Sequence, residues 1–198
     1  MVNIFYIMGK SATGKDTIYN KLKDIYDGIL TPLIQHTTRP MRINEQNGKE
    51  YYFVSNDEYQ EMINNNKVIT GHTYHTVNGD WSYFITNDFK KDNYIGIGNL
   101  FAYEKLKEQK NLQIFPIYIT VDDKERLQRA INRESLQINP NYKEICRRYI
   151  ADENDFSEER LEKLGIKKRF VNDNLDDTII EIKNYINGRL WWLIIKKN

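Results

Sequence analysis

The sequence contains one cysteine, Cys146, and three histidines among its 198 residues. A single cysteine cannot form an internal disulfide, and such low usage is typical of a reducing compartment. A zinc site built from thiolates is not expected either, because no second thiolate is available. We therefore expect the chemistry of this chain to depend on other residue types.

Excess charge of one sign is also absent, because 29 Lys and Arg face 28 Asp and Glu, a net charge of +1. This balance is not typical of proteins that bind nucleic acid or an acidic membrane surface through a broad positive face. Neither kind of partner is expected. Internal repeats are missing as well.

Long apolar runs are lacking, and the run at 190–195, which includes Trp191 and Trp192, is far shorter than the ~20 residues of a membrane span. We expect it to pack on the core or to form an edge for self-association, in a monomer or a homodimer. The apolar first residues have no basic segment before them and no small-residue cleavage site after them. A cytoplasmic protein without a signal peptide is therefore expected.

Residues 9–17 read Gly-Lys-Ser-Ala-Thr-Gly-Lys-Asp-Thr and are the most informative segment. An apolar run precedes them, and apolar residues at helical spacing follow over 17–26. Strand, glycine-bounded loop and helix are the context of a phosphate-binding loop. Backbone N–H groups and the positive end of the helix would then hold phosphate oxygens.

The loop supplies a first set of candidate residues for binding ATP. They are Gly9, Ser11, Ala12, Thr13, Gly14, Lys15, Asp16 and Thr17. Lys15 would place a full positive charge near the transferred phosphate, which makes it a catalytic candidate. The position after the lysine is usually Ser or Thr and binds Mg²⁺, but here it is Asp16, with a hydroxyl one residue later at Thr17. The metal ligand is therefore left open between these two.

The rest of the chain alternates short apolar runs with helical patterns. The runs that we expect to be strands are residues 2–8, 29–34, 94–97, 114–120 and 169–171. They are continuously apolar, as in parallel strands that are covered on both faces. Together with the loop, this alternation predicts an α/β P-loop fold with a five-stranded parallel core sheet flanked by helices.

Several polar residues are expected to mark the ends of helices. Asn99 is a candidate N-cap, and Asp122 with Glu125 has the spacing of a capping box. The last long helix is predicted to begin at Asp176 or Asp177 and to stop at Gly188.

Two segments interrupt this alternation and define the expected parts of a single domain. A small mixed insert at 37–88 is predicted to hold a strand at 51–54, a helix after Ser55, and two strands that meet near Asn78 and Gly79. A helical segment at 133–156 is the expected lid. The core would then comprise 1–36, 89–132 and 157–198. Both inserts leave the sheet where ligands bind in open α/β folds, so they could close over a ligand.

The insert begins with a second distinctive pattern, in which Arg39 and Arg42 are three residues apart and are followed by Glu45 and Tyr51. Guanidinium groups bind phosphate oxygens in forked pairs, and a tyrosine hydroxyl can add a donor. The pattern predicts an anion clamp, although such a charged run can also be an ordinary solvated loop.

Residues 37–53 have the form Thr-Thr-Arg-Pro-x-Arg-x-x-Glu-x-x-Gly-x-x-Tyr-x-Phe. Together with the phosphate-binding loop, this pattern resembles the guanylate kinase family of nucleoside monophosphate kinases. The resemblance extends over about residues 3–186. It includes the arginines at 126, 129, 133, 147 and 148, and the Val-Asn-Asp at 171–173.

The resemblance implies an enzyme with a core, an NMP-binding insert and a lid that converts GMP and ATP to GDP and ADP with Mg²⁺. By its motifs, the acceptor's phosphate would be held by Arg39, Arg42 and Tyr51, with Glu45 beside them. From the lid, Arg133 and Arg148 would reach the phosphates in transfer. Asn172, just before the last helix, would lie near the adenine of ATP.

The positions where this family recognises guanine differ in this chain. The family has a serine just before Thr-Thr, a glutamate after the insert's helix and aspartates at the end of the third core strand. Here these places hold Gln35 and His36, then Thr70, then Gly96 and Gly98. The usual Tyr-Gly-Ser/Thr becomes Trp-Ser-Tyr from Trp81 onward. Thr70 and Trp81 stay candidates for acceptor contact, and the acceptor's base is left open.

Other functions remain compatible with the sequence. Ribose bisphosphate kinases share this fold and often have Gly-Lys-Asp in the loop, although they usually lack the arginine–tyrosine pattern. Guanylate-kinase-like domains of scaffolding proteins bind phosphopeptides without catalysis, but they generally lose the phosphate-binding loop. A plain ATPase or a nucleic-acid kinase is a further alternative, and the near-zero net charge argues against the latter.

Overall fold

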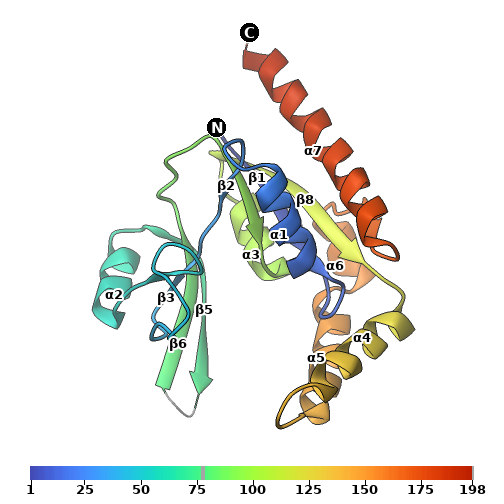
Figure 1. The fold of residues 1–198 in the computed structure, drawn as a ribbon. Helices are drawn as coiled ribbons and strands as arrows, with labels where there is room; N and C mark the ends of the chain where they lie inside the picture. The colour runs from blue at the N-terminus through green and yellow to red at the C-terminus, as the bar shows by residue number, and fades with distance from the viewer. Residues whose placement is uncertain (77–78, 198) are drawn as a thin grey trace.

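The computed structural model describes residues 1–76 and 79–197, and a five-stranded sheet forms its centre (Figure 1). In pairing order its strands are β2 (Thr31–Pro32), β7 (Asn93–Ile97), β1 (Val2–Met8), β8 (Leu112–Thr120) and β9 (Arg169–Val171). Every neighbouring pair is parallel. The five predicted strands are confirmed, but β2 pairs over two residues only, not over the whole of 29–34.

Strand β1 is central, and its residues from Ile4 to Met8 are completely buried. Alternate side chains point to opposite faces of a sheet. One face contributes Tyr6 to a core cluster with Tyr103 of α3 (Leu100–Lys107) and Leu161 of α6 (Glu158–Lys163). The other contributes Phe5 to a cluster with α1 (Lys15–Ile25) and α7 (Leu175–Lys197). Helices on both faces explain the continuously apolar strand sequences.

Three of the predicted helix starts are confirmed by side-chain caps. Asn99 accepts a hydrogen bond from the N–H of Ala102 at the start of α3. Asp122 accepts hydrogen bonds from the N–H groups of Lys124 and Glu125 at the start of α4 (Asp123–Ser135). Ser55 and Glu58 form a reciprocal capping box at α2 (Asn56–Asn64).

The insert forms a second sheet with α2 beside it (Figure 1). Its pairing order is β4 (Tyr52–Phe53), β3 (His36–Thr37), β6 (Gly79–Thr86) and β5 (Val68–Thr76). Strands β5 and β6 pair antiparallel up to Thr76 and Gly79, as the predicted hairpin requires. Of the predicted turn residues, Asn78 lies outside the described residues.

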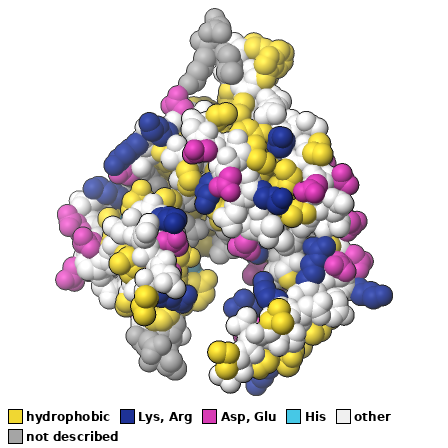
Figure 2. Space-filling model, viewed as in Figure 1, with side chains coloured by type: hydrophobic (Ala, Val, Ile, Leu, Met, Phe, Trp, Pro, Cys, Tyr) yellow, Lys and Arg dark blue, Asp and Glu magenta, His cyan; other side chains and the backbone are white. Residues whose placement is uncertain are grey.

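The lid segment, 133–156, begins in the last turn of α4 and consists mainly of α5 (Tyr142–Asp155). Chain order places both inserts after the carboxyl ends of core strands, because the insert follows β2 and the lid follows β8 and most of α4. The insert and the lid stand on opposite sides of the core in Figure 1. Figure 2 shows the surface hollowed between them, with Lys and Arg side chains at its edge.

Helix α7 differs from its prediction at both ends. It begins at Leu175, because the side chain of Asn174 accepts hydrogen bonds from the backbone N–H groups of Asp176 and Asp177. The predicted stop at Gly188 is wrong, since the helix continues through it to Lys197. Leu190 and Leu193 still pack against the core cluster, which favours the extension, while Trp191 is exposed.

The end of α7 projects from the core in Figure 1. Within the described part of the chain, no helix combines the length and the apolar character that crossing a membrane requires.

Candidate active site

Gly9 and Gly14, in the loop between β1 and α1, stand where a larger residue would not fit. Gly14 lies in the left-handed region with φ of 84°, and a Cβ there would overlap with Nδ2 of Asn172. A Cβ on Gly9 would lie 2.5 Å from the carbonyl oxygen of Ile119. The loop is therefore folded tightly against the ends of β8 and β9, as a backbone cradle for phosphate requires.

Asn172 holds this loop through a hydrogen bond from its side chain. Its Nδ2 donates to the carbonyl oxygen of Thr13 at 2.8 Å, and Asn172 itself is buried. The Thr13 hydroxyl donates to the carbonyl oxygen of Lys10 at 2.9 Å. Arg129 of α4 donates in turn to the carbonyl oxygen of Asn172. These bonds fix the loop conformation, while the predicted contact of Asn172 with adenine stays a prediction.

A hollow of about 280 Å³ lies over the loop, which we call the loop hollow. It is lined by Ser11, Ala12, Gly14, Lys15, Asp16, Thr17, Arg129, Arg133 and Arg148. Most of the loop residues expected to hold ATP thus face one space, together with both lid arginines. Gly9 and Thr13 shape the loop and are not among the described lining residues.

Positive charge dominates the loop hollow, because one lysine and three arginines line it and Asp16 is the one acid among its described lining residues. The carboxylate of Asp16 lies 3.8 Å from Nζ of Lys15. Such a set suits a polyphosphate, which needs several cations around it. Arg129 was not assigned a role from the sequence, although it lies one helical turn before Arg133 on α4, a spacing that puts both on one face.

The donor set also suits Mg²⁺ bound together with a nucleotide. Asp16 and Thr17 are both exposed and line the loop hollow. Mg²⁺ usually takes one or two protein oxygens beside phosphate oxygens and waters. No cluster of three or more His, Cys, Asp or Glu able to hold a metal occurs among the described residues, so nucleotide phosphates would have to complete the coordination.

At the entrance of the insert, Arg39 is buried and firmly oriented. Its Nη2 donates to Oε1 of Glu45 at 2.6 Å and its Nη1 donates to the carbonyl oxygen of Pro40 at 2.8 Å. The hydrogen bond with Glu45 is the main cause of the raised pKa of Arg39, and the same bond is the main cause of the lowered pKa of Glu45. The other oxygen of Glu45 accepts from the N–H of Arg42. Glu45 thereby fixes both arginine positions.

Tyr51 connects this arginine to a larger hollow. The Arg39 guanidinium lies 5.7 Å from the centre of the Tyr51 ring. Burial raises the pKa of the Tyr51 hydroxyl, which stays a neutral donor. Arg42 is exposed, and neither arginine is among the described lining residues of that hollow. The predicted clamp is therefore assembled in part, with Arg42 at its outer side.

The larger hollow, which we call the acceptor hollow, measures about 540 Å³ and lies between the insert and the core. Tyr51, Thr70 and Trp81, all predicted to contact the acceptor, line it. Its core side includes Gly98 and Asn99, at the end of β7 and the start of α3.

Arg148 lines both the acceptor hollow and the loop hollow. Its Nε donates to Glu144 at 2.8 Å, and this carboxylate also pairs with Arg147. The bonds from the two arginines, Arg147 first, lower the pKa of Glu144 to about 2. The two hollows are therefore adjacent, with one lid guanidinium between them.

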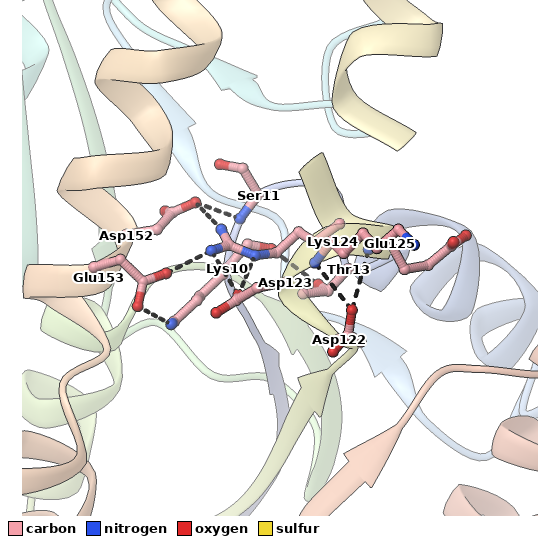
Figure 3. A network of polar contacts seen from close by, with 10 residues as sticks. Lys10, Ser11, Thr13, Asp122, Asp123, Lys124, Glu125, Asp152 and Glu153 are labelled. Atoms are coloured by element: carbon pink, nitrogen blue, oxygen red, sulfur yellow. Dashed lines mark hydrogen bonds and ion pairs between the residues drawn. The ribbon is translucent and has the colours of Figure 1, made fainter. Parts of the chain in front are cut away.

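A network of polar contacts joins the lid to the loop (Figure 3). Oδ2 of Asp152 accepts from the backbone N–H of Ser11 at 2.6 Å and from Arg126 at 3.4 Å. Glu153 accepts from Lys10 at 2.6 Å and from Arg126 at 2.5 Å. Arg126 is almost fully buried. The sequence did not indicate this network, because acids on a helix are ordinarily solvated surface residues.

The fold, with a glycine-bounded loop between β1 and α1 and two adjoining hollows, is that of an α/β protein of the P-loop type. The sequence model of one family, described as guanylate kinase, matches residues 2–189. The chain belongs to the guanylate kinase family.

Relatives and a solved structure agree with this membership. A guanylate kinase of Polaromonas sp. is 33% identical over 79 residues, which are 37% of this chain and 38% of that protein. A guanylate kinase of Malacoplasma penetrans is 27% identical over 177 residues, 86% of this chain and 81% of that protein. The crystal structure of guanylate kinase from Anaplasma phagocytophilum matches with a TM-score of 0.61 at 18% identity, covering 95% of this chain and 86% of that one. At this identity the structural match shows the fold.

Several of these matches are short. The match covers less than two fifths of the Polaromonas protein and 29% of a Neisseria gonorrhoeae guanylate kinase. The activity and the substrates of this chain are therefore stated below as proposals.

Proposed function

We propose that this protein is an ATP-dependent kinase that phosphorylates a nucleoside monophosphate, with GMP as the first candidate because of the family. The observation that supports this most strongly is the adjacency of two hollows that share Arg148. One is positively charged and lies over a phosphate-binding loop, and the other lies beside Arg39 and Tyr51. Two phosphorylated substrates could thus meet end to end.

In the proposed reaction, ATP binds with its phosphates over the loop and the acceptor binds with its phosphate toward Arg39, Arg42 and Tyr51. An oxygen of the acceptor phosphate forms a bond to the γ-phosphorus of ATP. The bond between that phosphorus and the β–γ bridging oxygen breaks, and ADP leaves with the bridging oxygen. Phosphoryl transfer needs positioning and charge neutralisation more than a protein nucleophile.

The cations of the loop hollow supply that neutralisation. Lys15 comes from the loop segment, Arg133 is the first residue of the lid segment, and Arg148 lies within α5. Mg²⁺, bound by the phosphates with Asp16 or Thr17, would offset further charge. We assign residues 37–88 to an acceptor-binding insert and 133–156 to a lid that excludes water when it closes. The single cysteine supports a reducing, cytoplasmic compartment.

A coupled assay of ADP release tests this proposal. The acceptors are GMP, AMP, CMP, UMP and ribose 1,5-bisphosphate, each with ATP and Mg²⁺, with ATP binding measured separately by calorimetry. ADP release that depends on a nucleoside monophosphate is the expected result. ATP binding without ADP release for any acceptor would identify a non-catalytic module. Release with the ribose phosphate alone would identify a sugar-phosphate kinase.

A further inference from the structure

The hydroxyl of Tyr6 lies buried behind the wall of the acceptor hollow. Tyr6 is fully buried in β1, opposite Gly96 of β7. A Cβ on Gly98 would overlap with the Tyr6 hydroxyl and would lie 3.6 Å from Nε2 of Gln35. Gly98 and Gln35 both line the acceptor hollow. The phenol therefore occupies the space that a side chain at position 98 would otherwise take.

This hydroxyl has no hydrogen-bond partner among the described residues. A buried polar group that lacks a partner destabilises the folded state, so such groups are rare in native proteins and call for a partner. Burial raises the pKa of Tyr6, which keeps the hydroxyl neutral, able to donate and to accept. Tyr6 is not among the described lining residues of the acceptor hollow, so a ligand would become the partner of this hydroxyl only by reaching past Gly98 and Gln35.

Neutral polar side chains line the hollow itself, among them Gln35 and Thr70. Gln35 donates from Nε2 to the carbonyl oxygen of Ile97 at 3.3 Å, which leaves its carbonyl oxygen as an acceptor. Thr70 is buried and lines the hollow from β5. None of the described lining residues carries a carboxylate.

Much of the remaining lining is aromatic. It includes Tyr51, Tyr74, Trp81, Tyr83, Phe84 and Phe101. Every nucleobase has a π-face, so stacking on aromatic side chains tolerates different bases. The hollow therefore offers stacking without a strong preference.

The absence of a carboxylate from these lining residues bears on which base is preferred. The Watson–Crick edge of guanine presents two neighbouring N–H donors, at N1 and at the N2 amino group. A carboxylate, with two acceptor oxygens, is their best single partner. An amide or hydroxyl offers one donor and one acceptor, and every base edge has groups that match such a pair.

We propose that Gln35 and Thr70, backed by the buried hydroxyl of Tyr6, recognise the acceptor's base through neutral hydrogen bonds, and that the site therefore accepts nucleoside monophosphates with more than one kind of base. This inference rests on the proposed function and specifies its substrate class.

The first test measures kcat/KM for GMP, AMP, CMP and UMP, and their Kd values by calorimetry on the whole chain. At least two bases should lie within about thirtyfold of each other, because a site built for one hydrogen-bonding pattern discriminates by about 10⁴-fold. Preference for a single base beyond about thirtyfold would overturn the inference. If the monophosphates bind but no ADP is released, the proposed function fails, and the ratio of Kd values decides the inference by the same limit. If none of them binds, both fail.

A matched pair of variants tests the role of the missing carboxylate. Thr70→Glu and Thr70→Gln add side chains of the same length, and only the first is charged. Thr70→Glu should shift the ratio of kcat/KM toward GMP by about tenfold or more relative to Thr70→Gln, because charged acceptors bind N–H donors more strongly. Equal ratios in the two variants would overturn the argument.

A second pair tests the buried hydroxyl. Tyr6→Phe removes it and keeps the ring, while Tyr103→Phe removes another buried phenol, whose ring lies 6.3 Å from that of Tyr6 and whose hydroxyl is not among the buried groups without a partner in the described residues. Tyr6→Phe should change the ratios of kcat/KM among the bases by about threefold or more, with the KM for ATP unchanged. Tyr103→Phe should leave those ratios as they are. Ratios that stay the same in Tyr6→Phe would remove Tyr6 from the recognition set and overturn its assignment.

Discussion

Asp152 accepts a 2.6 Å hydrogen bond from the backbone N–H of Ser11, so a carboxylate of the lid lies against the phosphate-binding loop (Figure 3). Backbone N–H groups of such loops attract anions. The same carboxylate also contacts Arg126. The loop thus already has an anionic partner from its own chain, and its charge acts against an approaching polyphosphate.

This relationship predicts the effect of Asp152→Asn on nucleotide binding. Removing one negative charge beside the loop should tighten ATP binding by about fivefold, roughly 1 kcal/mol. Calorimetric titration with ATP at low salt measures it. The matched control is Asp155→Asn on the same helix, whose carboxylate is exposed and faces Arg160. Weaker binding in Asp152→Asn would show that the carboxylate supports the loop rather than competing with phosphate.

Lys15→Met should abolish most of the turnover and leave the fold intact. The side chain of Lys15 lines the loop hollow and its charge would offset that growing on the transferred phosphate. Mutations of such preorganised groups lower kcat by about 10²–10³-fold. Steady-state ADP release measures the loss, and the melting temperature should stay near that of the wild type. Lys21→Met, an exposed lysine on the same helix, is the control and should keep full activity.

Arg39→Lys and Glu45→Gln should both act on the acceptor side of the reaction. Arg39 is oriented by its bond to Glu45, and a lysine cannot reproduce the forked geometry. The KM for the nucleoside monophosphate should rise about a hundredfold in Arg39→Lys and about tenfold in Glu45→Gln. In both, the KM for ATP should be unchanged. A parallel rise in both KM values would mean that these residues maintain the fold of the insert instead.

The sequence was sufficient for the parts of the molecule that local patterns determine. The five core strands, the caps at Asn99 and Asp122, and the strand–loop–helix around Gly14 are confirmed because period, cap and glycine signals depend on near neighbours. The lid–loop network was not predicted. Asp152 and Ser11 are 141 residues apart, and nothing local distinguishes this acid from a solvated one.

The same limit applies to Tyr6 and Gly188. Tyr6 looked like an ordinary residue of an apolar strand, and its position behind Gly98 depends on the pairing of β1 with β7. The sequence predicts a helix stop at Gly188 because glycine often ends helices. The apolar residues after it, Leu190 and Leu193, pack on the core and extend the helix instead.

His36 should make stability depend on pH. Its ring lies between those of Tyr52 and Phe84, its Nδ1 is buried without a partner among the described residues, and burial lowers its pKa. In the unfolded chain the pKa of His36 is near its ordinary value of 6.5. As the pH falls, His36 therefore takes up a proton in the unfolded chain before it does so in the folded protein. This contribution to stability is complete above about pH 6.5 and decreases as the pH falls toward the folded-state pKa.

Thermal unfolding at about pH 7.5 and about pH 5.5 measures this dependence. His36→Gln should lose less stability between the two pH values than the wild type does. His75→Gln, which changes a largely exposed histidine on β5, should keep the wild-type difference. An identical pH dependence in His36→Gln and wild type would assign the loss of stability in acid to other groups.

Gly188→Ala tests the course of α7 directly. A Cβ at this position would have no heavy atom within 4 Å, and the residue lies inside the helix. Alanine should therefore stabilise the protein by about 0.5–1 kcal/mol, because glycine loses more backbone entropy in a helix. The melting temperature should rise by about 1–4 °C. Gly28→Ala is the matched control, since a Cβ there is equally free of contacts but φ is +74°. Its strained backbone should lower the melting temperature, and a decrease in Gly188→Ala as well would mean that the helix ends at Gly188.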